Sequence, residues 1–156
     1  MMKINVDAAI SKNVGKATAA AIVRDEAGVF QGASVLVISG LLNPETMEAV
    51  ACREGLALAA DLGLRRFRMA SDCLSVVKTI QRSGLGAYGH VVMEIKARAA
   101  AFECSEIMHE SRTTNTDAHC LTRRFKVSKA MVVNDIVEAT EIKQRSDASL
   151  SSESDA

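Results

Sequence analysis

One change of hydrophobic period, at Asn43-Pro44, restricts the fold of this chain more than any other feature of its sequence. Before this point the apolar residues show the patterns of β-strands. Residues 3–8 show the pattern most strictly, because apolar and polar side chains alternate there without exception, which is typical of a half-buried strand. Two further strands are predicted at 17–24 and 29–38. Short polar turns separate the three strands, so they are expected to pair as an antiparallel meander.

After Asn43-Pro44 the apolar residues take a helical spacing. Asparagine is a favoured helix cap and proline is tolerated at the first helical position, so a helix is predicted from Pro44 to about Leu62, with Gly63 as its left-handed stop. One stripe of this helix consists of small residues and also carries Glu48. Because small residues let a helix lie close against a sheet, Glu48 is expected to face the sheet.

Helices and strands alternate in the rest of the sequence. The predicted elements are, in order, a strand at 66–71, a helix opened by Asp72, a helix at 89–102, a strand at 105–109 and a helix from Asn115 to Phe125. This order predicts an α/β fold with a mixed five-stranded sheet. Strands one to three are expected to be antiparallel and strands four and five parallel, with helices on both faces of the sheet.

The chain of 156 residues is expected to form one domain over residues 1–127. Residues 128–143 hold enough valine, isoleucine and methionine for a helical extension. Residues 144–156 are mostly serine and acidic residues, so we expect them to form a disordered acidic tail.

Polar residues interrupt the N-terminus and no run of about 18 apolar residues exists, which argues against a signal peptide and a membrane span. The protein is therefore expected to be intracellular, cytoplasmic or nuclear, and not secreted.

The charge balance excludes a strongly basic nucleic-acid binder, because 19 basic residues face 19 acidic ones. Only five residues are aromatic, which argues against a protein that binds single strands by stacking bases on aromatic rings. The charges are nevertheless uneven, since residues 1–127 are mildly basic and the tail is acidic. This distribution is a weak indication of a polyanionic partner.

Three acidic residues stand at the ends or inner faces of predicted elements. Asp7 lies on the first strand, Glu48 on the sheet-facing stripe of the first helix, and Asp72 at the end of the fourth strand. If the first and fourth strands are neighbours, the three carboxylates converge at one place and need a cation to neutralise them. Oxygen ligands favour Mg²⁺ or Mn²⁺. Taken singly, the same residues also suit a solvated strand position, a helix-edge charge and a helix cap.

Four segments of the sequence carry a resemblance to a known family. They read KINVDAA (3–9), AAAIVRDEAGVF (19–30), ETMEAVACREGLALAADLGLRRFRMASDCLSVVKTI (45–80) and IMHESRTTNTDAHCL (107–121). In this order they resemble the ribonuclease H family, specifically the reverse transcriptase-like domains common in plant genomes. The resemblance covers residues 3–127 and implies a ribonuclease H-like fold.

The resemblance implies a function and a set of site residues. Asp7, Glu48 and Asp72 match the first three metal-binding carboxylates of the family, and His119 stands at the position of the fourth. His109 matches a histidine proposed to move protons or help the product leave. The implied activity is Mg²⁺- or Mn²⁺-dependent cleavage of the RNA strand of an RNA–DNA hybrid by two-metal hydrolysis, with the hybrid as the nucleic-acid partner.

A second interpretation is a nucleic-acid-binding or interaction module of the same fold with weak or no catalysis. It rests on His119 in place of a carboxylate, on Ala8 where the family usually has glycine, and on the short 81–89 segment, whose one basic residue is Arg82. The family's basic helical handle is therefore missing. A third interpretation is a piece of a longer element-encoded polyprotein, because the chain begins almost on its first strand.

Overall fold

A computed structural model describes residues 1–40, 43–82, 88–125 and 132–133 of the chain. Its elements are β1 (Met2–Ser11), β2 (Lys16–Arg24), β3 (Phe30–Ser39), α1 (Pro44–Asp61), β4 (Arg66–Ser71), α2 (Leu74–Arg82), α3 (Gly89–Ala99), β5 (Cys104–His109), the 3-10 helix η1 (Arg112–Thr114), α4 (Thr116–Phe125) and β6 (Val132–Val133). From β1 to α4, the order of strands and α-helices is the one that the hydrophobic pattern predicts.

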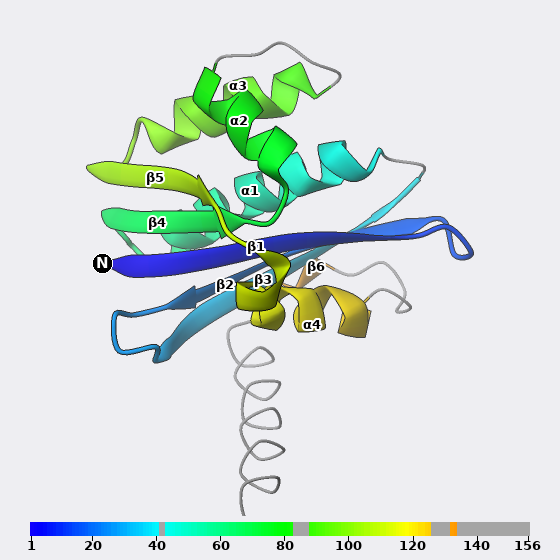
Figure 1. Cartoon of the computed structure of the whole chain (residues 1–156), viewed down its shortest axis with the longest axis horizontal. Helices are drawn as coiled ribbons and strands as arrows, with labels where there is room; N and C mark the ends of the chain where they lie inside the picture. The colour runs from blue at the N-terminus through cyan, green and yellow to red at the C-terminus, as the bar shows by residue number, and fades with distance from the viewer. Residues whose placement is uncertain (41–42, 83–87, 126–131, 134–156) are drawn as a thin grey trace, which may run out of the picture.

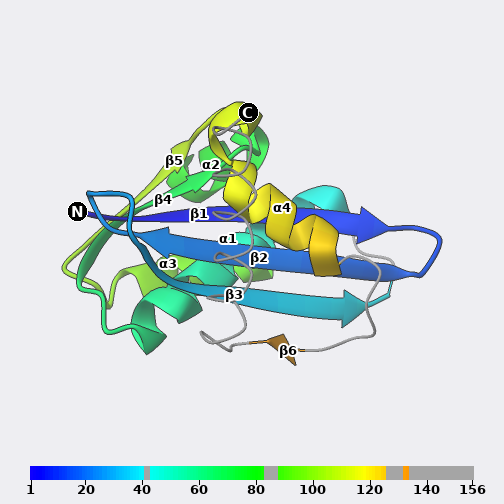
Figure 2. The same cartoon turned by 90° about the horizontal axis from the view of Figure 1, so that it is seen from below.

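The strands form one mixed sheet in the order β5-β4-β1-β2-β3-β6. β2 pairs antiparallel with β1 and with β3, whereas β4 pairs parallel with β1 and with β5. The predicted five-stranded sheet is thereby confirmed. Helices α1, α2 and α3 lie on one side of it and α4 on the other, as Figures 1 and 2 show.

At two residues of the segment 128–143, for which the sequence predicts a helical extension, the structure shows a strand instead of a helix. Val132–Val133 form β6, which pairs antiparallel with β3 through Val35↔Val133 and Leu36↔Val132. The open edge of β3 offers unpaired backbone groups, and pairing them satisfies hydrogen bonds that a helix would satisfy internally. The remainder of 128–143 and the whole predicted tail at 144–156 lie outside the described residues.

The main core lies between the sheet and α1, and Gly55 explains why α1 can approach so closely. A Cβ at this position would lie 2.9 Å from Met69 Sδ on β4 and 2.9 Å from Val6 Cγ1 on β1. Real Cβ atoms essentially never come that close, so any larger side chain would push α1 away from the sheet. The stripe of small residues therefore contacts the sheet, as the sequence predicts, and it brings Glu48 with it.

The start of α2 differs from the prediction in one detail. The helix begins at Leu74, and the backbone N–H of Cys73 is bound by the Ser71 hydroxyl oxygen at 3.2 Å. The Asp72 carboxylate lies beside a different residue, Arg112 of η1. In the part of the chain that the structure describes, no helix is both long and apolar enough to span a bilayer.

Candidate active site

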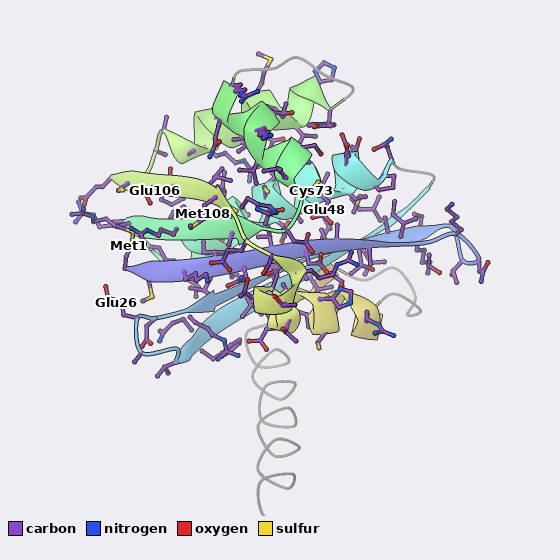
Figure 3. The ribbon with its side chains drawn as sticks, in the orientation of Figure 1. Met1, Glu26, Glu48, Cys73, Glu106 and Met108 are labelled. Atoms are coloured by element: carbon purple, nitrogen blue, oxygen red, sulfur yellow. The ribbon has the colours of Figure 1, made fainter. Side chains whose placement is uncertain are left out.

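The adjacency of β1 and β4 brings the three acidic residues together. The two strands run parallel with Val6 opposite Ser71, so Asp7 and Asp72 each follow directly on that pair. Glu48 enters from the first turns of α1, and Figure 3 shows it where α1 meets the end of β4 and the start of α2. One carboxylate oxygen from each of Asp7, Glu48 and Asp72 lies within 4.8 Å of the others. The predicted convergence is present in the structure.

Asp7 is the most buried carboxylate of the group, with 2% of its surface exposed. Its Oδ2 accepts a hydrogen bond from Thr122 Oγ1 at 2.9 Å, and His119 Nδ1 lies 3.1 Å from the same oxygen. Burial raises the pKa of Asp7, and the Thr122 hydrogen bond opposes that shift most. The negative charge of Asp72 raises the pKa further. Asp7 is thus held by α4 in a place where its charge needs compensation.

Glu48 carries the largest electrostatic penalty among the three acidic residues. Burial, followed by the charges of Asp7 and Asp72, raises the pKa of Glu48 to about 8. The Ala8 backbone N–H donates a hydrogen bond to this carboxylate and lowers the pKa in part. Glu48 Oε2 is buried and has no hydrogen-bond partner among the described residues. A buried carboxylate oxygen without a donor is costly, and Glu48 belongs to a group of three acidic residues that could hold a metal ion.

Asp72, the residue that follows the last residue of β4, completes the group of three carboxylates. Its side chain is 10% exposed, and its Oδ2 lies 3.4 Å from Nε of Arg112, the first residue of η1. The loop that carries Arg112 is aligned with β4, because the Glu110 N–H donates to the Ser71 carbonyl oxygen at 3.0 Å. Arg112 therefore stands beside the carboxylates, although its side chain is 77% exposed.

His119 lies on α4, and the member of the carboxylate group that its side chain contacts is Asp7. An ionised carboxylate can only accept hydrogen bonds, so Nδ1 of His119 carries the proton and donates it to Asp7 when Asp7 is charged. In the neutral imidazole with this tautomer, the lone pair is on Nε2. The cluster of oxygen ligands within 4.8 Å comprises the three carboxylates and does not include His119. The structure thus places His119 beside the group and bound to one of its members.

His109 stands at the rim. It is the last residue of β5 and pairs with Ser71 of β4, which places it across from the residue before Asp72. Its side chain is exposed and makes no hydrogen bond or ion pair with another described residue. The structure brings His109 to the same end of the sheet as the carboxylates, but not into contact with them.

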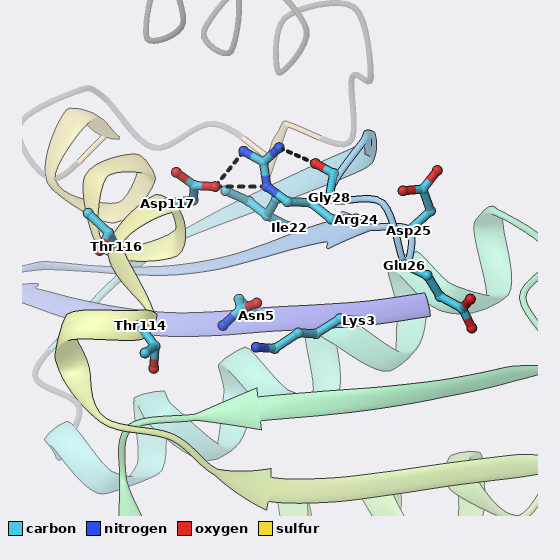
Figure 4. A pocket seen from close by; sticks show the side chains of 10 residues that line it. All are labelled: Lys3, Asn5, Ile22, Arg24, Asp25, Glu26, Gly28, Thr114, Thr116 and Asp117. Atoms are coloured by element: carbon cyan, nitrogen blue, oxygen red, sulfur yellow. Dashed lines mark hydrogen bonds and ion pairs between the residues drawn. The ribbon is translucent and has the colours of Figure 1, made fainter. Parts of the chain in front are cut away.

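The position of α4 depends on polar contacts around its N-terminus. Buried Asn115 donates from Nδ2 to the Val6 carbonyl oxygen at 2.7 Å, and its Oδ1 accepts from Asn5 Nδ2 at 3.0 Å. Arg24 donates to Asp117 and to the Gly28 carbonyl oxygen. These last residues line a hollow of ≈ 470 Å³ near the start of β1 (Figure 4), on the side of the sheet that α4 covers. All three side-chain nitrogens of Arg24 are engaged, and two of them bind Asp117 at the start of α4.

Sequence reasoning did not single out Thr122, Arg112 or Asn115 as parts of the site. A signal existed for Thr122, because it follows His119 by three residues and therefore shares its helix face. No comparable signal existed for Arg112, whose place depends on how the loop after β5 continues the pairing with β4. Asn115 was placed at the start of the last helix, but its bonds to β1 required the tertiary structure.

Comparisons with known proteins agree with this fold. The family model described as "Reverse transcriptase-like" matches residues 5–125. A search of the curated proteins finds no match.

Several solved structures have the same fold. RNase H1 from the halophilic archaeon Halobacterium salinarum is 20% identical, covers 83% of this chain and 98% of its own, and superposes with a TM-score of 0.74. The N-terminal RNase H domain of a Mycobacterium tuberculosis protein is 21% identical, with 80% and 92% coverage and a TM-score of 0.72. LC11-RNase H1 in complex with an RNA/DNA hybrid is 18% identical, with 90% and 99% coverage and a TM-score of 0.69. At these identities the similarity establishes the fold.

Proposed function

The chain belongs to the reverse transcriptase-like family, and from this membership and its carboxylate group we propose that it is a metal-dependent endonuclease that cleaves the RNA strand of RNA–DNA hybrids. The observation that carries the proposal is the convergence of Asp7, Glu48 and Asp72 within 4.8 Å. The hybrid bound to LC11-RNase H1, a protein of the same fold, supports the choice of nucleic acid.

The residues present fit a divalent metal site. Three carboxylates share one small volume, and Glu48 Oε2 is buried without a partner among the described residues. The raised pKa values of Asp7 and Glu48 have burial as their largest cause and mutual repulsion as a further one, and a cation relieves both. All the donors are oxygens, which suits Mg²⁺ or Mn²⁺. Two such ions, when bound, supply water activation and stabilisation of the leaving oxygen in phosphodiester hydrolysis.

The side chains around the group have separate roles in this proposal. Asp7, Glu48 and Asp72 hold the metal, and Thr122 fixes the Asp7 carboxylate. His119 borders the site with Nε2 available as a neutral ligand, while its Nδ1–H orients toward Asp7. Exposed His109 at the end of β5 is suited to exchange protons with solvent as the product leaves. Cleavage leaves a 5′-phosphate and a 3′-hydroxyl.

His119 also favours a second candidate function, a hybrid-binding module with weak catalysis. An imidazole brings no negative charge in its neutral form, and it prefers softer divalent ions than Mg²⁺. In this structure its Nδ1 is engaged with Asp7, so it adds one neutral ligand atom where a carboxylate would add charge. This candidate predicts hybrid binding without cleavage in Mg²⁺.

Single-turnover cleavage of a labelled RNA–DNA hybrid, with Mg²⁺ and separately with Mn²⁺, tests the proposal. Asp7→Asn and Asp72→Asn should abolish cleavage, because each removes a ligand. Glu48→Gln should do the same, and Glu54→Gln is its matched control. Glu54 lies on the same helix and is half-buried, but it bonds to Ser34 rather than to the group. Cleavage at the unmutated rate by the Asp7 and Asp72 variants would overturn the assignment.

A further inference from the structure

Arg112 occupies an unusual place for an arginine of this chain. The Glu110 N–H bonds to the Ser71 carbonyl oxygen at 3.0 Å, so the chain leaving β5 continues beside the end of β4. Two residues later Arg112 begins η1 and directs Nε toward Asp72 Oδ2 at 3.4 Å. Its side chain is 77% exposed, whereas that of Asp72 is 10% exposed, so the guanidinium contacts one carboxylate of the group and is also open to solvent.

The contact with Asp72 engages only one of the nitrogen atoms of the Arg112 guanidinium, Nε. At 3.4 Å it is longer than the charge-assisted hydrogen bonds of well-formed ion pairs, and 77% of the arginine side chain is exposed. Such exposed pairs contribute little to stability. A guanidinium has five N–H donors, and among the described residues only Nε of Arg112 has a partner.

Arg24 shows what a structural arginine looks like in the same molecule. Its Nε and Nη2 both donate to Asp117, and its Nη1 donates to the Gly28 carbonyl oxygen at 3.0 Å. All three of its nitrogens are engaged. The contrast indicates that Arg112 is not needed to hold two parts of the fold together, and that its free donors face outward.

The charge of Arg112 acts on the group that the substrate must approach. The Arg112 Nε lies 3.4 Å from Asp72 Oδ2, and Asp72 is one of the three carboxylates that cluster within 4.8 Å, so the positive charge of Arg112 acts on the cluster. A phosphodiester that comes near three carboxylates is repelled by them, and a cation at the entrance offsets that repulsion.

We propose that Arg112 is a substrate-binding residue that takes a backbone phosphate of the RNA–DNA hybrid at the entrance of the carboxylate site. This inference rests on the proposed function. The planar fork of a guanidinium matches two phosphate oxygens, and most of the Arg112 side chain is exposed beside the carboxylate group. Asp72 holds the guanidinium near this position in the absence of substrate.

Hybrid binding in EDTA tests the role without cleavage. Fluorescence anisotropy of a labelled hybrid, measured over a range of KCl concentrations, gives both the affinity and its salt dependence. Arg112→Ala should weaken binding by about threefold to tenfold and should reduce the slope of log K against log salt by about 0.7–0.9, the value of one phosphate contact. Arg112→Lys should keep the slope and recover part of the affinity, because the charge remains and the fork is lost.

The matched control is Arg68→Ala. Arg68 also donates from Nε to a carboxylate, Glu106 Oε2 at 3.0 Å, and its side chain is 55% exposed, but it lies on β4 away from the group. This variant should bind the hybrid like the native protein. Thermal unfolding of each variant confirms that it is folded, and Arg112→Gln is a second neutral variant that keeps the length of the stem.

Asp72 gives an independent test within the same assay. Asp72→Asn releases the guanidinium and removes a repulsive charge, so it should tighten hybrid binding in EDTA. Because the contact with Asp72 engages only Nε of Arg112, Arg112→Ala should still weaken hybrid binding in the Asp72→Asn background. No loss of affinity on Arg112→Ala in that background would overturn the role of Arg112 in phosphate binding.

The remaining outcomes separate the two proposals. Unchanged affinity and salt slope in Arg112→Ala, with normal binding by the native protein, would overturn the role of Arg112 and leave the proposed function intact. Equal losses in Arg112→Ala and Arg68→Ala would do the same, since they would reflect net charge alone. Failure of the native protein to bind the hybrid, in EDTA and in Mg²⁺ alike, would instead overturn the proposed function.

Discussion

Asn115 Nδ2 donates a hydrogen bond to the Val6 carbonyl oxygen at 2.7 Å, and this bond fixes the start of α4 to the residue that precedes Asp7. The two residues are 109 positions apart in the sequence. Asn115 is 1% exposed, so the bond lies in a place where water cannot replace it. His119 and Thr122, which follow on α4, contact Asp7 as a consequence of this docking.

Asn115→Ala is expected to destabilise the protein by about 1–3 kcal/mol, because it removes the Asn115 donor from the Val6 carbonyl oxygen and leaves the Asn5 amide with only its 3.5 Å contact to Glu110 Oε2. It should also lower hybrid cleavage, since α4 no longer holds Asp7 firmly. Urea unfolding measures the first effect and single-turnover cleavage the second. Asn13→Ala, in the exposed turn after β1, is the control. A stability equal to that of the control would contradict the docking role.

Gly55→Leu is expected to destabilise the protein by about 1–3 kcal/mol or more, because its first side-chain atom already meets Met69 and Val6 at 2.9 Å. Ala60→Leu, on the exposed side of the same helix, should change the free energy of unfolding little. Urea unfolding of both variants measures their free energies of unfolding and tests this expectation. Similar stabilities would mean that α1 does not lie against the sheet through Gly55, and Glu48 would lose its placement.

The stability of the metal-free protein should depend on pH through Glu48. Its pKa rises from 4.5 to about 8 on folding, chiefly through burial. Between these values the folded state keeps a proton that the unfolded state has lost, so the free energy of unfolding falls as pH rises across this range. Asp7, whose pKa is also raised, acts in the same direction.

Glu48→Gln removes this titration and should flatten the pH dependence. In EDTA the variant should be more stable than the native protein at pH values near 8, with a smaller difference at low pH, where Glu48 is protonated. Urea unfolding at a series of pH values gives the comparison, and Glu54→Gln is again the control. A pH profile of the variant that parallels that of the native protein would show that Glu48 is not the titrating group.

His119→Asp is expected to raise cleavage in Mg²⁺, because it adds a negative charge and hard oxygen ligands beside Asp7. The Mg²⁺ concentration that gives half-maximal cleavage should fall by about tenfold or more. The native protein should be more active with Mn²⁺ than with Mg²⁺. Single-turnover rates across both metal concentrations measure these effects. Equal Mg²⁺ dependence of native protein and variant would show that His119 does not weaken the site.

The same variant has a readout that does not depend on catalysis. In EDTA an added carboxylate next to Asp7 increases repulsion and should lower the free energy of unfolding. Mg²⁺ should then stabilise the variant more than it stabilises the native protein. A variant whose stability does not respond to Mg²⁺ would indicate that the added carboxylate does not reach the metal.

The elements of this protein follow from its sequence because they depend on neighbours along the chain. Alternation over residues 3–8 makes β1, and the Asn43-Pro44 start with the Gly63 stop bounds α1. The φ of Gly63 is +66°, the left-handed conformation that glycine adopts at no cost. The site residues Asp7, Glu48 and Asp72 could likewise be predicted from the sequence. They are acidic residues at the ends or inner faces of predicted elements, so the predicted ligands of the site are carboxylate oxygens.

Only the tertiary structure decided which atoms meet. The parallel register that sets Val6 opposite Ser71 arises from packing across the whole sheet, and it alone makes Asp7 and Asp72 neighbours. The missing partner of Glu48 Oε2 and the approach of Arg112 to Asp72 depend on how α1 and the loop after β5 are seated. Periodicity gives the face on which a side chain lies, but distances between residues far apart in sequence are set by long-range packing, which no local pattern encodes.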